Sequence, residues 1–258
     1  MRGLALCLMI AAGPALADAP WFTEQAQAVG LDFRHINGMS GQLWFVENVG
    51  GGVALFDYDN DGDLDVYLNQ GQRLGQPPDP KLRDRLYRND LGIGPDGRPR
   101  LAFTDVTEAS GIRALGYGMG VAAADYDNDG WIDLYVLNFG PNQLWRNLGN
   151  GRFEDVTEQS GLTNVDLSFS FGVAAGDFDN DGDQDLYVAN GFPKDVTDRD
   201  FSDFRATSSR LVSHEQLYAA IPEVKSPNFM FVNNGDLTFT NRTREWGMQM
   251  PSFSYGAA

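Results

Sequence analysis

One nine-residue pattern occurs three times in this chain, at residues 57–65 (DYDNDGDLD), 125–133 (DYDNDGWID) and 177–185 (DFDNDGDQD). The copies begin 68 and 52 residues apart, and their flanks are repeated with them. Small apolar residues precede each copy, and an apolar run of strand length follows it. Self-similarity over tens of residues indicates an array of repeated structural units.

Each unit contains four candidate strands. In the middle unit these are GMGVAAA, LYVLNFG, LWRNLGNG (144–151) and FEDVTEQSGL (153–162). Short runs of β-branched and aromatic residues bounded by Gly, Asn and Asp favour strands. Four strands per repeat are typical of a β-propeller blade, whereas a β-sandwich would explain the strands but not their repetition.

We therefore predict an all-β fold of four-stranded antiparallel blades. About three blades are expected, at roughly 48–110, 118–160 and 169–246, within a propeller that begins at residue 18 and continues to residue 258. Residues 252–258 (SFSYGAA) match the start of the repeat at 168, so a further blade is expected to begin near 252 and to be cut short. Residues 22–31 (FTEQAQAVGL) resemble the last strand of a unit, and could close a ring from the start of the chain.

The three acidic turns have the spacing of calcium loops. Counted from the first Asp, positions 1, 3, 5 and 9 are Asp, and position 6 is Gly (Gly62, Gly130 and Gly182). In loops of the type D-x-[DN]-x-[DN]-G, positions 1, 3 and 5 bind through side-chain oxygens and position 7 through its backbone carbonyl. The predicted ligands are Asp57, Asp59, Asp61, Asp63 and Asp65, then Asp125, Asp127, Asp129, Trp131 and Asp133, then Asp177, Asp179, Asp181, Asp183 and Asp185, with Asp63, Trp131 and Asp183 binding through the backbone.

Oxygen ligands without His or Cys favour Ca²⁺ over Zn²⁺ or copper, and Mg²⁺ rarely uses an all-protein cage. Position 12 is Leu68, Val136 or Val188 rather than Glu, so these are not EF-hands. We expect about three Ca²⁺ ions that clip the hairpins between the first and second strands, rather than catalytic or sensor sites.

The N-terminus has the pattern of a signal peptide. Arg2 precedes an apolar stretch that is too short to span a bilayer, and Ala15-Leu16-Ala17 suits cleavage after residue 17. We expect an exported protein, located in the periplasm, outside the cell or at its surface. The net charge of −17 argues against nucleic acids and anionic membranes as partners.

Two long connections follow second strands, at 70–85 and 191–227, and the second has a helix-like stretch near 209–220. Both leave the edge opposite the acidic turns, so we expect a partner there, although these insertions could equally only cap the scaffold. Neither histidine, His35 or His214, belongs to a recognisable catalytic motif, and no phosphate loop or nucleophile motif is present. We therefore expect no enzyme.

The stretch FGVAAGDFDNDGDQDLYVANG, with the LWRN and F-x-D-V-T segments, resembles the FG-GAP/VCBS repeats of integrin-α-type propellers. The array as a whole is similar to exported proteins of the cartilage-acidic-protein-like type, which carry it before an ASPIC/UnbV domain; no such segment is visible here. The resemblance implies a propeller, commonly seven-bladed, with Ca²⁺ in the hairpins. It favours a scaffold for protein or glycan recognition and adhesion. The alternative is a propeller-based hydrolase or lyase, with its active site in the central cleft or in sequence beyond residue 258.

Overall fold

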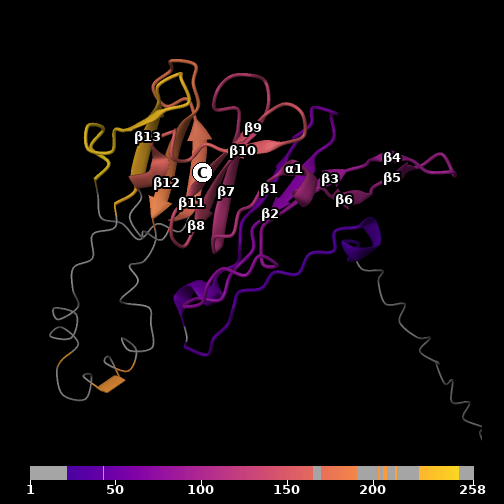
Figure 1. The fold of residues 1–258 in the computed structure, drawn as a ribbon, viewed down its shortest axis with the longest axis horizontal. Coiled ribbons are helices and arrows are strands. Elements are labelled where there is room, and N and C mark those ends of the chain that lie inside the picture. The colour runs from indigo at the N-terminus through magenta and orange to yellow at the C-terminus, as the bar shows by residue number, and fades with distance from the viewer. Residues whose placement is uncertain are drawn as a thin grey trace, which may run out of the picture.

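The computed structural model describes residues 22–42, 44–164, 170–190 and 227–249, with residues 203, 206, 207 and 213. These residues form three four-stranded antiparallel sheets that follow one another along the chain (Figure 1). This confirms the prediction of an all-β fold of four-stranded antiparallel sheets. The predicted signal peptide (1–17) and the blade expected near 252 lie outside the described residues, as does nearly all of the helical insertion within 191–227.

Within each four-stranded sheet, the strands lie in the order of the sequence, and a separate two-stranded hairpin stands between the third and fourth strands of the first sheet. The first sheet contains β1 (Val53–Phe56), β2 (Asp65–Leu68), β3 (Arg85–Asn89) and β6 (Phe103–Asp105). The second contains β7 (Gly118–Ala124), β8 (Asp133–Asn138), β9 (Gln143–Asn147) and β10 (Phe153–Asp155). The third contains β11 (Ser170–Gly176), β12 (Asp185–Asn190), β13 (Phe229–Asn233) and β14 (Phe239–Asn241).

The first strands of the three sheets lie side by side, with β7 between β1 and β11 (Figure 1). Their small residues permit this approach. A Cβ atom on Gly52 would come within 2.6 Å of the Cα atom of Gly120, closer than real Cβ contacts allow. The small-residue runs before the acidic turns therefore reflect the packing of one sheet against the next.

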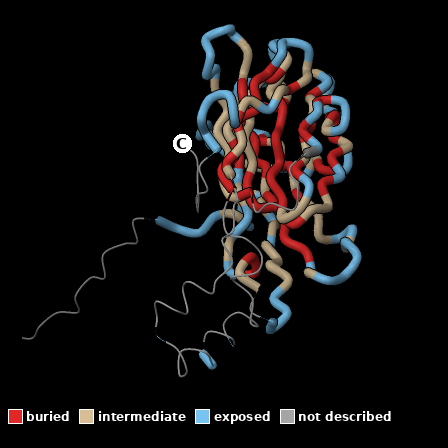
Figure 2. The backbone as a smooth tube through the Cα atoms, turned by 90° about the vertical axis from the view of Figure 1, so that its left-hand side faces the viewer, coloured by how far each residue is buried: buried red, intermediate tan, exposed pale blue. Residues whose placement is uncertain are grey.

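Two apolar clusters fill the spaces between the sheets. One lies between the first and second sheets and includes Phe56, Tyr58 and Trp145, and the other joins the second and third sheets through Tyr126 and Phe239. The Tyr126 and Phe239 rings meet edge to face at 6.1 Å between centroids. The buried segments in Figure 2 run through the sheets, while the connecting turns are exposed. Each sheet is thus stabilised by its neighbour, because one sheet alone has a face that must be buried.

Two features differ from the sequence predictions. The connection between β3 and β6 carries an unforeseen hairpin, β4 (Gly92–Ile93) and β5 (Pro99–Arg100), which projects from the first sheet (Figure 1). Residues 22–25, expected as an outer strand, have no strand conformation and lead into a 3₁₀ helix, η1 (Gln27–Val29). Each of the three described four-stranded sheets already has its own fourth strand, and the last blade that this segment was expected to complete is not among them.

The remaining helical elements are short. Among the elements whose bounds the structure describes, they are η2 (Phe45–Asn48), α1 (Thr107–Ser110) and η3 (Leu162–Asn164). The helix α1 directly follows β6, and its C-cap residue Gly111 has φ 78°. A glycine in the left-handed conformation commonly ends a helix. The Ser110-Gly111 pair that follows the F-x-D-V-T strand therefore marks the end of this short helix.

Candidate metal centres

The acidic turns connect the first and second strands of the three sheets, and their backbones repeat one conformation. In the first turn, Asn60 has φ 55° and Gly62 has φ 93°. Asn128 and Gly130 in the second turn, and Asn180 and Gly182 in the third, share these positive values. Glycine and asparagine tolerate the left-handed region better than other residues. The sequence analysis identified the glycine but missed the asparagine at position 4, although all three copies contain it.

The carboxylate at position 1 folds each turn around itself. In the first turn, Asp57 Oδ1 accepts a hydrogen bond from the Asp61 amide at 3.1 Å, and Oδ2 accepts one from the Gly62 amide at 2.8 Å. Asp125 and Asp177 make the same pair of bonds in their own turns. Position 1 therefore shapes the turn before any ion binds.

The carboxylate at position 9 is buried and joins the turn to the third strand. Asp65 Oδ2 accepts from the Tyr58 amide at 2.9 Å, and Oδ1 accepts from the Asn89 amide of β3 at 2.7 Å. Asp133 and Asp185 have equivalent partners. Position 9 thus has a structural role that the calcium-loop pattern does not predict.

In each turn, three carboxylates converge. One oxygen from each residue lies within 4.8 Å of the others in three groups: Asp57, Asp59 and Asp61; Asp125, Asp127 and Asp133; Asp177, Asp179 and Asp185. The predicted ligands Asp65, Asp129 and Asp181 are not part of these groups. Three carboxylates at this separation could hold a metal ion.

The side chains at position 7 lie outside the three groups. The Trp131 indole covers Gly149, where an added Cβ would approach Nε1 to 2.6 Å. Asp183 Oδ1 accepts a hydrogen bond from Asn128 Nδ2 at 2.7 Å. These contacts are compatible with binding through the backbone carbonyl, because such a ligand leaves its side chain for other contacts.

Burial raises the pKa of several of these carboxyl groups. It raises the pKa of Asp65 to about 6 and that of Asp133 to about 7, against the opposing effect of their backbone hydrogen bonds. Burial is also the main cause of the raised pKa of Asp59, followed by the charges of Asp61 and Asp57. A cation among the carboxylates would have the opposite effect, since a nearby positive charge favours the ionised form.

The residues fit a hard cation. All of the converging side-chain atoms are carboxylate oxygens, which suit Ca²⁺ or Mg²⁺. Asp59 Oδ1 is also buried without a hydrogen-bond partner among the described residues. An unpaired buried carboxylate oxygen is costly, and an ion in the first turn would satisfy it.

The second turn differs from the others because an arginine enters it. Arg146 of β9 places Nη2 2.5 Å from Asp127 Oδ2 and 3.3 Å from Asp129 Oδ2. In the first sheet, Arg88 at the same strand position instead pairs with Asp90, and the third sheet has Val232 there. The three candidate centres are therefore chemically unequal.

Neighbouring turns are also linked to one another. Asn60 Nδ2 donates to the Gly130 carbonyl oxygen at 3.1 Å, across from the first turn to the second. Asn147 of β9 donates to the Tyr58 carbonyl oxygen at 2.8 Å, and Asn233 of β13 donates to the Tyr126 carbonyl oxygen at 2.7 Å. The asparagines that end β9 and β13 therefore reach back to the turn of the preceding sheet, a role that sequence analysis did not find, whereas Asn89 of β3 donates to the Leu64 carbonyl oxygen of its own turn.

The repeated turns lie within the regions that match a known family. The profile of the FG-GAP-like repeat matches residues 57–136 and 125–188, which together cover more than half of the chain. The chain belongs to the FG-GAP repeat family. This confirms the resemblance on which the sequence interpretation relied. Within the FG-GAP array, each matched region begins at position 1 of an acidic turn.

Relatives of this FG-GAP chain include cartilage acidic protein 1 from two vertebrates. The protein of Mus musculus is 29% identical over 142 residues, which are 55% of this chain and 21% of the relative. That of Xenopus tropicalis is 31% identical over 91 residues, which are 35% of this chain and 14% of the relative. The matched part is thus about a fifth or less of these longer proteins. Among the described residues, no helix is long and apolar enough to cross a membrane.

Proposed function

We propose that this protein is an exported, Ca²⁺-stabilised β-propeller scaffold for protein or glycan recognition and adhesion. The observation that carries the proposal is the convergence of three carboxylates in each of three linked acidic turns. The acidic turns repeat in all three described four-stranded sheets and are hydrogen-bonded to one another. This arrangement suits ions with a structural role better than one ion with a catalytic role.

The propeller part of the proposal is supported by the free face of the third sheet. Tyr58 and Tyr126, at position 2 of their turns, are buried against the next sheet. Phe178, at the same position of the third turn, is 45% exposed and shares a shallow cavity with Tyr187, Met230, Trp246 and Met248. A further blade, with an aromatic residue and an asparagine in the places of Phe239 and Asn233, would cover this surface.

Calcium is the preferred ion because Mg²⁺ demands a tighter octahedral shell and keeps its water ligands. When bound, Ca²⁺ would neutralise the carboxylates that otherwise repel one another. The residues at positions 1 and 9 already orient two carboxylates through backbone hydrogen bonds, so little ordering remains to be done on binding. At a Ca²⁺ concentration one hundred times Kd, each site would add about 2.7 kcal/mol to the free energy of unfolding.

Thermal unfolding with Ca²⁺ and with a chelator tests this proposal. For a domain of this size, each occupied site should raise the midpoint by about 5–10 °C. The variants Asp57→Asn, Asp125→Asn and Asp177→Asn should each lose part of this increase. Asn keeps one oxygen that can accept an amide hydrogen bond but removes the charge, so the turns should still fold.

Asp32→Asn is the matched control, because Asp32 is an exposed carboxylate outside the turns. It should respond to Ca²⁺ like the unchanged protein. Equal midpoints with Ca²⁺ and with chelator, measured on the unchanged protein, would refute the calcium part of the proposal.

The partner is proposed to bind opposite the acidic turns, through the connections at 70–85 and 191–227. β2 starts in the first acidic turn at Asp65 and ends at Leu68, where the 70–85 connection begins, so the two lie at opposite ends of the sheet. Deleting residues 195–225 should weaken binding of the partner to the folded protein. Unchanged binding would assign that insertion a capping role only.

We propose that the protein is not an enzyme. The one histidine among the described residues, His35, lines a cavity beside Arg34 and Arg73, and no described carboxylate lines that cavity. A histidine base is normally oriented by a further polar group. The alternative, a hydrolase or lyase, would need its acid–base partners from elsewhere; turnover of a polysaccharide substrate abolished by His35→Ala would establish it.

A further inference from the structure

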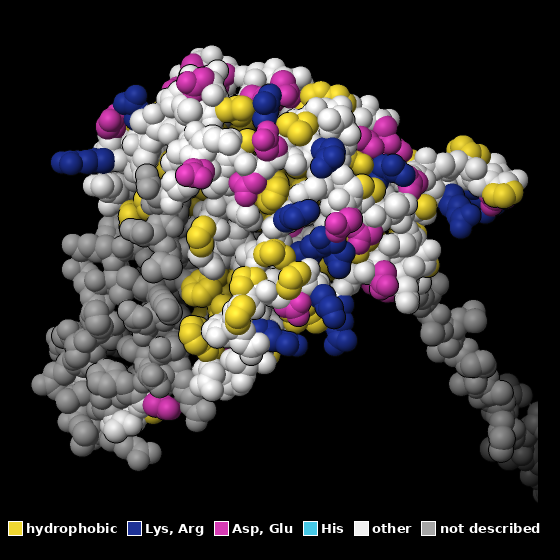
Figure 3. Space-filling model, viewed as in Figure 1, with side chains coloured by type: hydrophobic (Ala, Val, Ile, Leu, Met, Phe, Trp, Pro, Cys, Tyr) yellow, Lys and Arg dark blue, Asp and Glu magenta, His cyan; other side chains and the backbone are white. Residues whose placement is uncertain are grey.

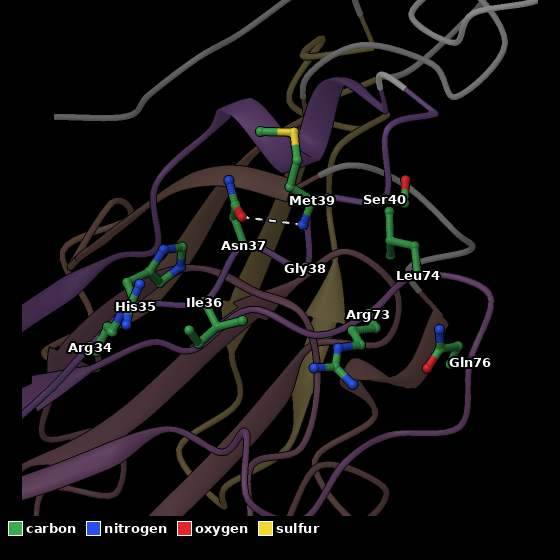
Figure 4. Close-up of a pocket in the computed structure, with 10 residues that line it drawn as sticks. All are labelled: Arg34, His35, Ile36, Asn37, Gly38, Met39, Ser40, Arg73, Leu74 and Gln76. Carbon is green, nitrogen blue, oxygen red and sulfur yellow. Dashed lines mark hydrogen bonds between the residues drawn. The ribbon is translucent and has the colours of Figure 1, made fainter.

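A cavity of about 540 Å³ lies between the N-terminal segment and the start of the 70–85 connection (Figure 4). Residues 34–40 form one wall, and Arg73, Leu74 and Gln76 form the other. Its volume falls within the range of about 300–1,000 Å³ that is common for small-ligand sites. It lies at the end of the first sheet opposite the acidic turn, and so is separate from the candidate metal centres.

The two walls are fixed to each other by a buried amide. Gln70 Oε1 accepts from the Ile36 amide at 2.7 Å, and Gln70 Nε2 donates to the Arg34 carbonyl oxygen at 3.0 Å. The walls also touch directly, since a Cβ on Gly71 would approach the Ile36 carbonyl oxygen to 2.3 Å and one on Gly38 would approach the Gln72 carbonyl oxygen to 2.1 Å. The cavity is thus built by tightly packed backbone.

A second buried side chain holds the far wall. Gln72 Oε1 accepts from the Asp79 amide at 3.0 Å, and Gln72 Nε2 donates to the Leu82 carbonyl oxygen. This fixes the loop that carries Arg73. On the other side, Asn37 Nδ2 donates to the Glu47 carbonyl oxygen at 2.6 Å, and Ser40 donates its amide to Glu47 Oε1 at 3.0 Å.

The cavity concentrates positive charge in an acidic protein. The chain carries a net charge of −17, yet Arg34, His35 and Arg73 line this site and no described Asp or Glu does. Both arginines are exposed, and neither guanidinium group has a hydrogen bond or ion pair to the described residues, which is also true of the exposed Arg98, Arg100, Arg113, Arg152 and Arg244. His35 Nε2 is buried and also has no partner there. What sets Arg34 and Arg73 apart is that they share one cavity with His35 and with no described carboxylate, and such a lining suits an anionic ligand.

The other lining groups narrow the class of ligand. Ser40 offers a hydroxyl group and Gln76 an amide, while the Asn37 amide already bonds to the Glu47 carbonyl oxygen and the Met39 amide; Ile36, Met39 and Leu74 are the apolar lining residues. No aromatic ring of the described chain lines the cavity except the imidazole of His35, so a nucleobase lacks a large stacking surface. Figure 4 shows Arg34 and His35 next to each other on one side of the cavity, Arg73 below Gly38, and Ser40 and Gln76 on the other side. Arg34 and Arg73 thus reach the cavity from its two walls, with Ser40 and Gln76 beside them, an arrangement that suits a small anion that also carries hydroxyl groups.

The surroundings favour a short ligand. On the face shown in Figure 3, most Lys and Arg side chains lie in the central and lower part, with acidic side chains interspersed. The net negative charge of the protein repels a long polyanion, because repulsion between like charges extends over about 10 Å at moderate salt concentration. A single sugar unit or the end of a chain can enter without bringing further negative charge close to the protein.

We propose that this cavity is a binding site for an acidic saccharide unit, with Arg34 and Arg73 recognising its carboxylate and Ser40 and Gln76 its hydroxyl groups. The proposal rests on the proposed recognition function and assigns that function a ligand class and a place. Arg34, Arg73 and the residues around them become specificity determinants of the scaffold.

The test is equilibrium binding of glucuronate and galacturonate to the Ca²⁺-loaded protein, with glucose, sulfate and phosphate as comparison ligands. A uronate should bind at least about 10-fold more tightly than each comparison ligand, and binding should weaken as salt increases. Arg34→Glu and Arg73→Glu should each weaken uronate binding at least about 10-fold. Arg98→Glu, the same change of charge on the exposed β4–β5 hairpin, should leave it unchanged.

Equal binding by the three variants, or equal binding of glucose and uronate, would overturn the anion site. Sulfate or phosphate binding as tightly as a uronate would overturn the assignment to a saccharide. Thermal unfolding with and without Ca²⁺ on the same samples separates these failures from failure of the scaffold proposal. A protein that keeps its calcium stabilisation but binds no uronate refutes this inference alone.

Discussion

Replacing the buried carboxylate of Asp84 should change the dependence of stability on pH. Asp84 is 1% exposed and accepts three hydrogen bonds, from the Tyr67 hydroxyl at 2.8 Å, Asn69 Nδ2 at 2.8 Å and the Gln70 amide at 2.7 Å. The second and third sheets have asparagines, Asn142 and Asn228, in the same place. Both accept the equivalent amide hydrogen bond and donate to the equivalent tyrosine hydroxyl. The site thus accommodates Asn, and Asp84 is the exception.

Burial raises the pKa of Asp84 from 3.8 to about 7, against the opposing effect of these hydrogen bonds. The folded state therefore binds the proton more tightly than the unfolded state. Its contribution to stability is complete below pH 3.8 and is lost as the pH rises towards 7. At about 1.4 kcal/mol per pKa unit, the loss between pH 5 and pH 8 is about 3 kcal/mol.

The variant Asp84→Asn does not titrate at this position. Its free energy of unfolding, relative to that of the unchanged protein, should therefore rise by about 3 kcal/mol from pH 5 to pH 8. Asn69 Oδ1 is buried without a partner among the described residues, so a flip of the Asn69 amide would give the newly introduced side-chain amide an acceptor. Urea unfolding followed by tryptophan fluorescence measures both proteins at the two pH values, with chelator present in every sample.

The converse variant, Asn142→Asp, supplies the matched control. It places a carboxylate in the second sheet, where the Tyr135 and Ser170 hydroxyl groups now lie near Asn142 Nδ2. It should lose stability between pH 5 and pH 8, while Asp84→Asn gains stability relative to the unchanged protein. Parallel stability curves for Asp84→Asn and the unchanged protein would refute the reasoning, because the buried carboxylate would then have no raised pKa.

Three further predictions concern the linked sheets. Arg146→Val should tighten Ca²⁺ binding in the second turn several-fold, because it removes the cation beside Asp127. Calorimetric titration should then show one strengthened site, and unchanged affinities would contradict this prediction. Asn233→Ala should lower the free energy of unfolding by about 1–3 kcal/mol, because the buried Tyr126 carbonyl oxygen loses this hydrogen-bond donor. Asn147→Ala should cost an equal amount at the Tyr58 carbonyl oxygen, and urea titration measures both losses. Gly52→Ala should cost about 1–3 kcal/mol in the same assay because its Cβ would strike Gly120, whereas Gly50→Ala has open space and should be neutral.

The repeats made the sheets and the turns predictable from sequence. Small residues, an acidic turn and an apolar run recur in a fixed order, and each local pattern favours its own element. The hairpin β4–β5 was missed because its residues occur in one unit only, so repetition gave no signal for it. Residues 22–25 form no strand, because a strand needs a partner edge, and the last blade that this segment was expected to complete is not among the described sheets; closure of a ring by residues 22–31 stays a prediction.

The residues of the candidate sites also fall into those that the sequence predicted and those that only the structure revealed. The sequence by itself determined the turn carboxylates, their spacing and the glycine that permits the turn, because a calcium loop is a local structure. Only the tertiary structure showed that Asp65 bonds to a strand 24 residues away, that Asn147 reaches the Tyr58 carbonyl oxygen 89 residues away, and that Arg146 enters one turn of the three. It alone also brought Arg34 and Arg73 to one cavity. Contacts between residues so far apart depend on how the sheets pack, and no local pattern encodes that packing.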